Sequence, residues 1–407
     1  MGKKRIALIT VAISFSYAAG YVAKTVLSGI MPLIVEVGVF TKKDLGAMGS
    51  AFMLAYGFGQ LVNGIIGDIL NPKRLIMAGL IGGGLVTFFF PYVQYASLAI
   101  FLWGLCGFFC STLWGPLSKI VAENMETRIA RILMLFLTAA SITGSMLAYV
   151  VCAVVSNWET AFFVSGIYMI ATSVLWYLII TLLEKRKQIS YKTKRDKLLE
   201  GQKGLGINAR YLVNHAIIPV TIAIMLNSII RNAASFWIPT YIKEAFEVKA
   251  SFSSAIIIVL PIVNLVGTII SYKMLPLFKD NEHTLSACLF GFSSIMFILI
   301  LLLGNVMSIA ITAMFLASAA MSGVCNLLFS VYVLRFSKTG RTSGIAGSLD
   351  FAAYMMASLA NTLIGFWVEK FGWSFVILTW CIATVAGIAA SVVSHRLVAN
   401  KDFNIHQ

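Results

Sequence analysis

Two basic residues stand inside long apolar stretches of this sequence, where a charge is costly. Lys24 lies within residues 6–35, and Arg231 lies within residues 214–242. A cation at the centre of a bilayer costs about 2.5–3.5 kcal/mol on insertion scales, so each should have a compensating partner. A pair of buried cations predicts a binding site for a small organic anion.

A protein carboxylate is the other possible partner. Asp350, in Ser348-Leu349-Asp350-Phe351, is the one acid deep within an apolar stretch, and it cannot neutralise two bases at once. Asp350 is therefore either the charge partner of one base or a proton carrier. The sequence leaves both roles open.

Polar residues surround both cations at helical spacing. Tyr17, Tyr21, Lys24 and Ser28 are spaced 4, 3 and 4 residues apart, which places them on one helix face. In the second stretch Asn227, Arg231 and Ser235 have the same kind of spacing. We expect the two polar faces to meet between the halves of the protein.

The elements that position these residues are membrane spans. The chain has 407 residues, of which 59% are hydrophobic and only 12% charged, whereas soluble domains carry about 25% charged residues. Apolar runs long enough to cross a bilayer must form helices, because each span has to satisfy its own backbone. We predict an all-α membrane protein with twelve spans, near residues 6–35, 46–66, 75–94, 96–121, 133–155, 159–183, 214–242, 251–272, 284–303, 306–334, 342–368 and 373–394.

The net charge of +15 is distributed unevenly between the loops. Alternating the loops across the bilayer places about 24 of the 31 Lys and Arg residues on one side and five on the other. By the positive-inside rule, we expect a protein of the bacterial inner membrane with both termini on the cytoplasmic side. This distribution fits a lipid bilayer as partner and excludes nucleic acid.

The spans form two related halves. A basic linker at 184–212 separates an N-terminal six-helix half, 1–183, from a C-terminal half with a short tail, 213–407. Lys24 stands eight residues before Pro32, and Arg231 stands eight before Pro239. Repeated halves are typical of transporters that bind substrate near the bilayer midplane. We expect a monomer that works by alternating access.

A charged segment lies between the second and third spans. It reads Gly67-Asp68-Ile69-Leu70-Asn71-Pro72-Lys73-Arg74. Asp68, Lys73 and Arg74 could form a latch between halves or helices that opens and closes during transport. A plain polar loop is the alternative.

The sequence contains no motif that indicates an enzyme active site, a metal site or a nucleotide site. The glycines at 79 and 82–84 resemble a phosphate-binding loop in composition, but the lysine of the Walker motif does not follow them. Inside an apolar span they predict a close-packing surface instead. We find no catalytic triad, paired carboxylates or metal-spaced cluster, and we expect no cofactor.

At these residues the chain resembles the organophosphate:phosphate antiporters of the major facilitator superfamily, which include glycerol-3-phosphate and hexose-phosphate transporters. The resemblance rests on three islands of sequence. They contain Tyr17, Tyr21, the base at 24, Met31-Pro32, Gly38, Asp44-Leu45-Gly46, Gly49-Ser50-Ala51-Phe52, Ala55-Tyr56-Gly57-Phe58 and Asn71-Pro72-Lys73-Arg74, then Arg231, Trp237, Pro239-Thr240-Tyr241 and Lys243-Glu244, and finally Gly365, Val368-Glu369 and Phe371-Gly372-Trp373.

The resemblance implies that Lys24 and Arg231 bind the anion, with Tyr17 and Tyr21 beside Lys24. Four positions differ from the family pattern. Lys24 replaces an arginine, Gln60 replaces a frequent lysine, Ser141 stands where a substrate-contacting histidine would be, and Lys119 replaces an arginine after Trp114-Gly115-Pro116. Asp350 is not part of that pattern.

Three functions remain open at this point. The first is a secondary transporter of small organic anions that exchanges organic phosphate esters for phosphate. The second is a proton-coupled sugar-acid or carboxylate symporter, and the third is a transporter-like ligand sensor. We predict a substrate site made of Lys24, Arg231, Tyr17, Tyr21, Gln60, Ser141, Asn227, Trp237 and Asp350.

Overall fold

The computed structural model describes residues 3–69, 71–189, 216–334 and 342–405. Within these ranges every regular element is a helix, which is the element that satisfies the backbone inside hydrocarbon. The chain divides into two compact units. The first unit comprises Met1–Lys203 and Lys249–Ile258, and the second comprises Gly204–Val248 and Val259–Gln407.

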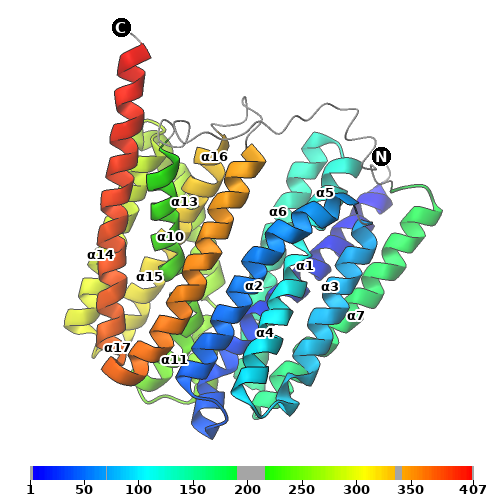
Figure 1. The fold of residues 1–407 in the computed structure, drawn as a ribbon, viewed down its shortest axis with the longest axis horizontal. Helices are drawn as coiled ribbons and strands as arrows, with labels where there is room; N and C mark the ends of the chain where they lie inside the picture. Colours follow the sequence, from blue (N-terminus) through cyan, green and yellow to red (C-terminus); the bar gives the residue numbers. More distant parts are fainter. Residues whose placement is uncertain (1–2, 70, 190–215, 335–341, 406–407) are drawn as a thin grey trace. The chain divides into compact units, whose positions relative to one another are not determined.

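The helices of the first unit run from α1 to α7, followed much later in the chain by α12. Their bounds are α1 Lys3–Val37, α2 Lys42–Ile69, α3 Pro72–Phe89, the short η1 Phe90–Tyr92, α4 Ala96–Ser111, α5 Trp114–Asn124, α6 Thr127–Val154, α7 Trp158–Lys185 and α12 Ala250–Ile257. Here α1 packs against α6 and α7, α2 against α4, and α3 against α7 (Figure 1).

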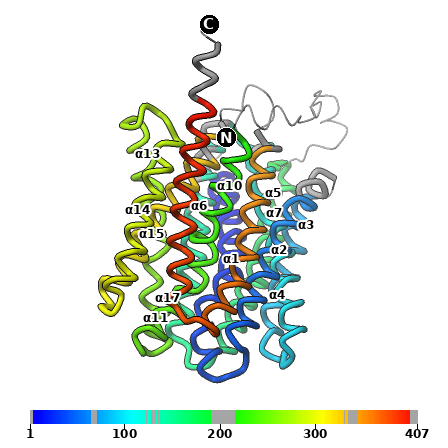
Figure 2. The backbone as a smooth tube through the Cα atoms, turned by 60° about the vertical axis from the view of Figure 1, so that its left-hand side comes forward, coloured from blue at the N-terminus to red at the C-terminus, as the bar shows by residue number. Residues whose placement is uncertain are grey.

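The second unit contains the remaining helices. Their bounds are α10 Ile217–Ser228, η2 Ile229–Ala234, α11 Ser235–Ala245, α13 Leu260–Met274, η3 Leu275–Phe278, α14 Glu282–Leu303, α15 Met307–Asn326, η4 Leu327–Val331, α16 Tyr332–Leu334 and α17 Thr342–Ile405. In this unit α10 and α14 pack against α17, while α13 and α14 pack against α15 (Figure 2).

Eleven helical stretches of the described chain are long and apolar enough to cross a membrane. The last one, Ile345–Val398, has 54 residues, more than twice the roughly 20 that one crossing needs. Gly372 divides it with φ of 77°, a backbone conformation that glycine adopts without steric cost. With that division, the described residues contain twelve such stretches, the number that the sequence predicts.

Local sequence signals set where α2 and α3 begin. The Thr41 hydroxyl accepts from the Asp44 backbone N–H, and the Asp44 carboxylate accepts from the Thr41 N–H, both at 3.1 Å. Asn71 caps α3 by accepting from the Lys73 N–H at 2.9 Å, and Pro72 follows in the first turn, where its missing N–H costs nothing. The segment Asn71-Pro72-Lys73-Arg74 is thus a helix start.

The glycines of α3 form a packing surface, as the sequence predicts. A Cβ at Gly82 would come within 2.5 Å of the Phe109 ring, and one at Gly84 would come within 2.8 Å of Ile170. Small residues therefore bring α3 close to α4 and α7.

Two spans of the second unit contain a stretch of π-helix. One is η2, between α10 and α11, and the other is η4, between α15 and α16. A π-turn holds one residue more than an α-turn and is often found at functional positions. Arg231 lies within η2.

Candidate functional site

Aromatic rings surround Lys24 in the first unit. Its Nζ lies 5.4 Å from the centroid of the Tyr21 ring and 5.4 Å from that of Tyr56. Tyr17 in turn packs against Tyr21, with centroids 5.1 Å apart, and against Trp114. Each cation–π contact is worth about 0.5–2 kcal/mol, depending on desolvation. The Tyr21 and Tyr56 rings thus pack around a half-buried ammonium group.

Tyr56 is absent from the predicted site, although it belongs to an island that carries the family resemblance. It stacks on Phe52 one turn earlier in α2, and its ring reaches Lys24 on α1. The 4-residue spacing of Phe52, Tyr56 and Gln60 places all three on one face of α2. Gln60, which is half-buried, thus lies one turn from a residue that contacts Lys24.

Ser141 lies on α6, whose face meets α1. One turn later, Ser145 accepts a hydrogen bond from the Thr25 hydroxyl at 3.2 Å, and Thr25 is the residue after Lys24. Ser141 is half-buried one turn from this contact. Tyr17, Tyr21 and Lys24 are thus connected by contacts along α1, while Gln60 and Ser141 each lie one turn from a residue that contacts α1.

Arg231 is half-buried and belongs to the π-helix η2. The expected α-helical face of Asn227, Arg231 and Ser235 is interrupted there, because a π-turn takes about one extra residue and rotates the residues after it. Pro239, inside α11, supplies a partial sequence signal for irregular winding.

Asn227 and Trp237 are deeply buried in the second unit. The Asn227 amide donates to the Met321 carbonyl of α15 at 2.7 Å. The Trp237 ring has no exposed surface and packs edge-on against Trp373, with centroids 6.3 Å apart. In this conformation both side chains serve the packing of the helix that carries Arg231.

Asp350 is half-buried in the first turns of α17. It lies three residues before Ala353, so the two share a helix face. The Ala353 carbonyl accepts a hydrogen bond from the Ser228 hydroxyl of α10 at 2.6 Å. The face of α17 that carries Asp350 is thus the face that packs against the helix preceding Arg231.

The predicted latch residues are placed differently from one another. The Lys73 ammonium pairs with the Glu184 carboxylate at 2.7 Å, donates to the Thr181 hydroxyl at 2.8 Å and lies 4.6 Å from the Tyr177 ring centroid. All three partners are on α7, in the same unit. Arg74 is exposed, and the side chain of Asp68 lies outside the described part of the structure.

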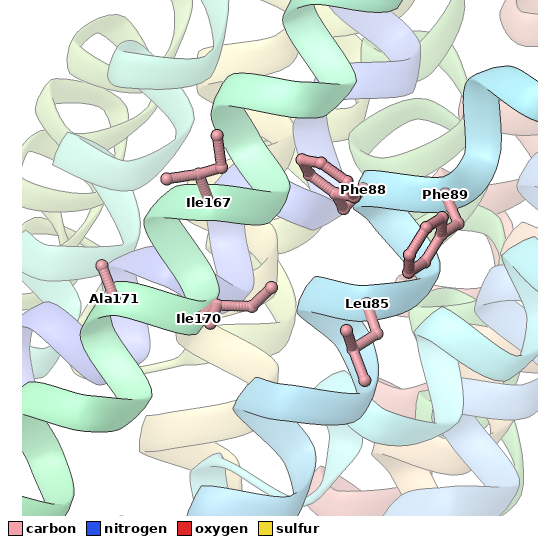
Figure 3. Close-up of a pocket in the computed structure, with 6 residues that line it drawn as sticks. All are labelled: Leu85, Phe88, Phe89, Ile167, Ile170 and Ala171. Atoms are coloured by element: carbon pink, nitrogen blue, oxygen red, sulfur yellow. The ribbon is translucent and has the colours of Figure 1, made fainter.

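A pocket of about 320 Å³ opens between α3 and α7 (Figure 3). It is lined by Leu85, Phe88, Phe89, Ile167, Ile170 and Ala171. Its lining is apolar and includes none of the predicted site residues, so it suits hydrocarbon and not an anion.

The sequence profile of the Major Facilitator Superfamily matches residues 13–358, which is most of the chain. This chain belongs to the Major Facilitator Superfamily. It is accordingly a multi-pass membrane transporter by family and not an enzyme.

Curated superfamily relatives agree with the resemblance found in the sequence. The membrane sensor protein UhpC of Salmonella typhimurium is 22% identical, over 98% of this chain and 93% of its own length. The glycerol-3-phosphate transporter of Bacillus subtilis is 23% identical, over 95% and 92%. A probable hexose phosphate transport protein of Chlamydia muridarum is 28% identical over 38% of this chain and 35% of its own.

Solved structures of superfamily members share the fold. A D-xylose-proton symporter superposes with a TM-score of 0.75 at 14% identity, covering 97% of this chain and 98% of its own. A bacterial homologue of the human lysosomal transporter Spinster gives a TM-score of 0.71 at 10% identity, with 98% and 96% covered. These identities support the major facilitator fold alone.

Proposed function

We propose that this superfamily member is a secondary transporter of small organic anions that exchanges organic phosphate esters for phosphate. The observation that carries the proposal is Lys24, a cation held against two tyrosine rings inside a membrane-spanning helix. Tyrosine rings position an ammonium group by cation–π contact, and a cation within the membrane is a candidate binding point for an anionic substrate.

A second cation supports this proposal. Arg231 stands eight residues before Pro239, as Lys24 stands eight before Pro32. A guanidinium can bind two phosphate oxygens at once, whereas an ammonium acts as a point charge. Arg231 would therefore orient the phosphate group, while Lys24 would add charge. The relatives named as glycerol-3-phosphate and hexose phosphate transporters point to the same substrate class.

The protein works as a monomer in a bacterial inner membrane with both termini in the cytoplasm, in keeping with the positive-inside rule. Two six-helix halves, 1–183 and 213–407, expose the site to each side in turn around the linker 184–212. Tyr17, Tyr21, Gln60 and Ser141 line the site beside Lys24.

Two observations favour other functions. Asp350, an acid on a membrane-spanning helix, favours a proton-coupled symporter of sugar acids or carboxylates. The similarity to UhpC, which is named a sensor, favours a ligand sensor with the transporter fold.

Exchange in reconstituted vesicles tests the proposal. Vesicles loaded with phosphate should take up radiolabelled glycerol 3-phosphate, and unloaded vesicles should not. Uptake that needs a proton gradient and no internal phosphate would replace antiport by symport. Binding of glycerol 3-phosphate without any exchange would identify a sensor.

A further inference from the structure

Arg231 and Lys24 occupy matching places in the two repeats but differ in backbone. Each cation stands eight residues before a proline. The helix around Lys24, α1, is an uninterrupted α-helix from Lys3 to Val37, with Pro32 inside it. The helix around Arg231 changes to π-winding from Ile229 to Ala234. The proline is therefore not sufficient to cause the π-turn.

A chain of hydrogen bonds sits at the start of this π-turn. Asn232, within the turn, donates its amide N–H to the Ser228 hydroxyl at 2.9 Å. The Ser228 hydroxyl donates in turn to the Ala353 carbonyl of α17 at 2.6 Å. Ser228 is 1% exposed and Asn232 is 8% exposed, so water does not readily replace these bonds.

A third hydrogen bond connects the end of α10 to a different helix. Asn227, the residue before Ser228, donates to the Met321 carbonyl of α15 at 2.7 Å. The last turn of α10 is thus bonded to two different helices just before the winding changes. The positions in α1 that match Ser228 and Asn232 hold Tyr21 and Thr25, and there the helix stays regular.

We propose that Ser228 and Asn232 are positioning residues, which hold the π-turn of η2 and so set the direction in which Arg231 presents its guanidinium. This inference rests on the proposed function, in which Arg231 binds the anion. An α-helical turn in place of η2 would hold one residue fewer and would rotate Arg231 away from its present direction. A bidentate contact requires an accurately oriented guanidinium group. Anion affinity should therefore depend on Ser228 and Asn232, although neither residue touches the anion.

The test measures affinity for glycerol 3-phosphate and inorganic phosphate by titration calorimetry on the purified full-length protein. Ser228→Ala and Asn232→Ala should each raise Kd about tenfold, the equivalent of losing one buried hydrogen bond of roughly 1.4 kcal/mol. Ser228→Thr keeps a hydroxyl and should stay within about threefold of the original Kd, which corresponds to roughly 0.6 kcal/mol. Arg231→Ala is measured in parallel.

Ser294 offers a matched control in the same unit. It is a buried serine whose hydroxyl donates to the Thr384 hydroxyl at 2.8 Å, between α14 and α17. Ser294→Ala should lower the melting temperature as Ser228→Ala does, yet leave Kd unchanged. Equal loss of affinity in both variants would show general destabilisation and overturn the inference.

A deletion tests the backbone directly. Removing Ala233 takes out the extra residue and lets the span wind as an α-helix while the flanking helices keep their faces. This variant should remain folded by circular dichroism and lose anion binding, as Arg231→Ala does.

The outcomes separate the two proposals. If Arg231→Ala loses binding while Ser228→Ala, Asn232→Ala and the deletion all bind normally, the positioning role is wrong and the anion site stands. If one serine or asparagine variant fails to fold, the other variant and the deletion decide. If Arg231→Ala binds normally, or neither probe anion binds the unaltered protein, the anion site itself is wrong and the positioning role falls with it.

Discussion

At the scale of single residues, Arg231 and Lys24 differ in hydrogen-bond geometry. We expect Arg231→Lys to lower the exchange rate at least tenfold while expression stays near normal, because an ammonium group cannot replace a planar fork that binds two oxygens. Initial rates in proteoliposomes measure this. Lys24→Arg is the control, since it keeps the charge and can still pack against Tyr21 and Tyr56. Normal exchange by Arg231→Lys would remove Arg231 from the binding site.

Tyr56 tests the aromatic surroundings of Lys24. Tyr56→Phe keeps the ring and should bind the anion nearly as well as the unaltered protein. Tyr56→Leu removes the ring 5.4 Å from the Lys24 ammonium and should weaken binding about three- to tenfold, in line with a cation–π energy near 1 kcal/mol. Calorimetric Kd values compare the two. Equal affinities in both variants would show that the ring does not position Lys24.

At the scale of elements, the Lys73–Glu184 pair connects the first turn of α3 to the last turn of α7. Lys73→Met and Glu184→Gln should each lower the melting temperature, and a double-mutant cycle should give a coupling of about 1 kcal/mol, since the side chains are only 12% and 28% exposed. Arg74→Gln changes an exposed neighbouring residue and should leave the melting temperature unchanged. Additive effects of the two changes would mean that the pair contributes nothing measurable.

Asp68 is the acid of the predicted latch, at the end of α2. Asp68→Asn should slow turnover more than it weakens ligand binding, because a latch acts on the conformational change and not on the site. Exchange rates at saturating substrate and Kd from calorimetry separate the two effects. A collapse of binding with unchanged turnover of bound substrate would contradict the latch.

At the scale of the whole molecule, Asp350 separates antiport from symport. In vesicles carrying Asp350→Asn, net uptake driven by a proton gradient is compared with exchange of internal for external substrate. As a charge partner for one of the two half-buried bases, Asp350 should be needed for driven uptake and for exchange, so we expect both rates to fall together. Loss of driven uptake alone, with exchange intact, would make Asp350 the proton carrier and the protein a symporter.

Much of the fold can be predicted from length and hydropathy. A membrane span satisfies its backbone within itself, so the twelve crossings needed no knowledge of neighbours, and Gly372 divides the last long helix where the sequence places a turn. The grouping of Tyr17, Tyr21 and Lys24 was equally accessible, because residues three and four apart share a helix face. Tyr56 was missed as a site residue because its contact with Lys24 joins two different helices.

The sequence by itself thus determined the class of the protein, its spans and the two cations, Lys24 and Arg231, on which the proposed anion site rests. Tertiary structure alone decided how Arg231 is presented, because the π-turn is bonded through Ser228 to Ala353, a residue 125 positions away. It also decided that Lys73 pairs with Glu184, 111 positions away. Local helix propensity scarcely distinguishes a π-turn from an α-turn, or one ion-pair partner from another. The energies that decide come from hydrogen bonds, and only the packing of helices brings the partners of those bonds together.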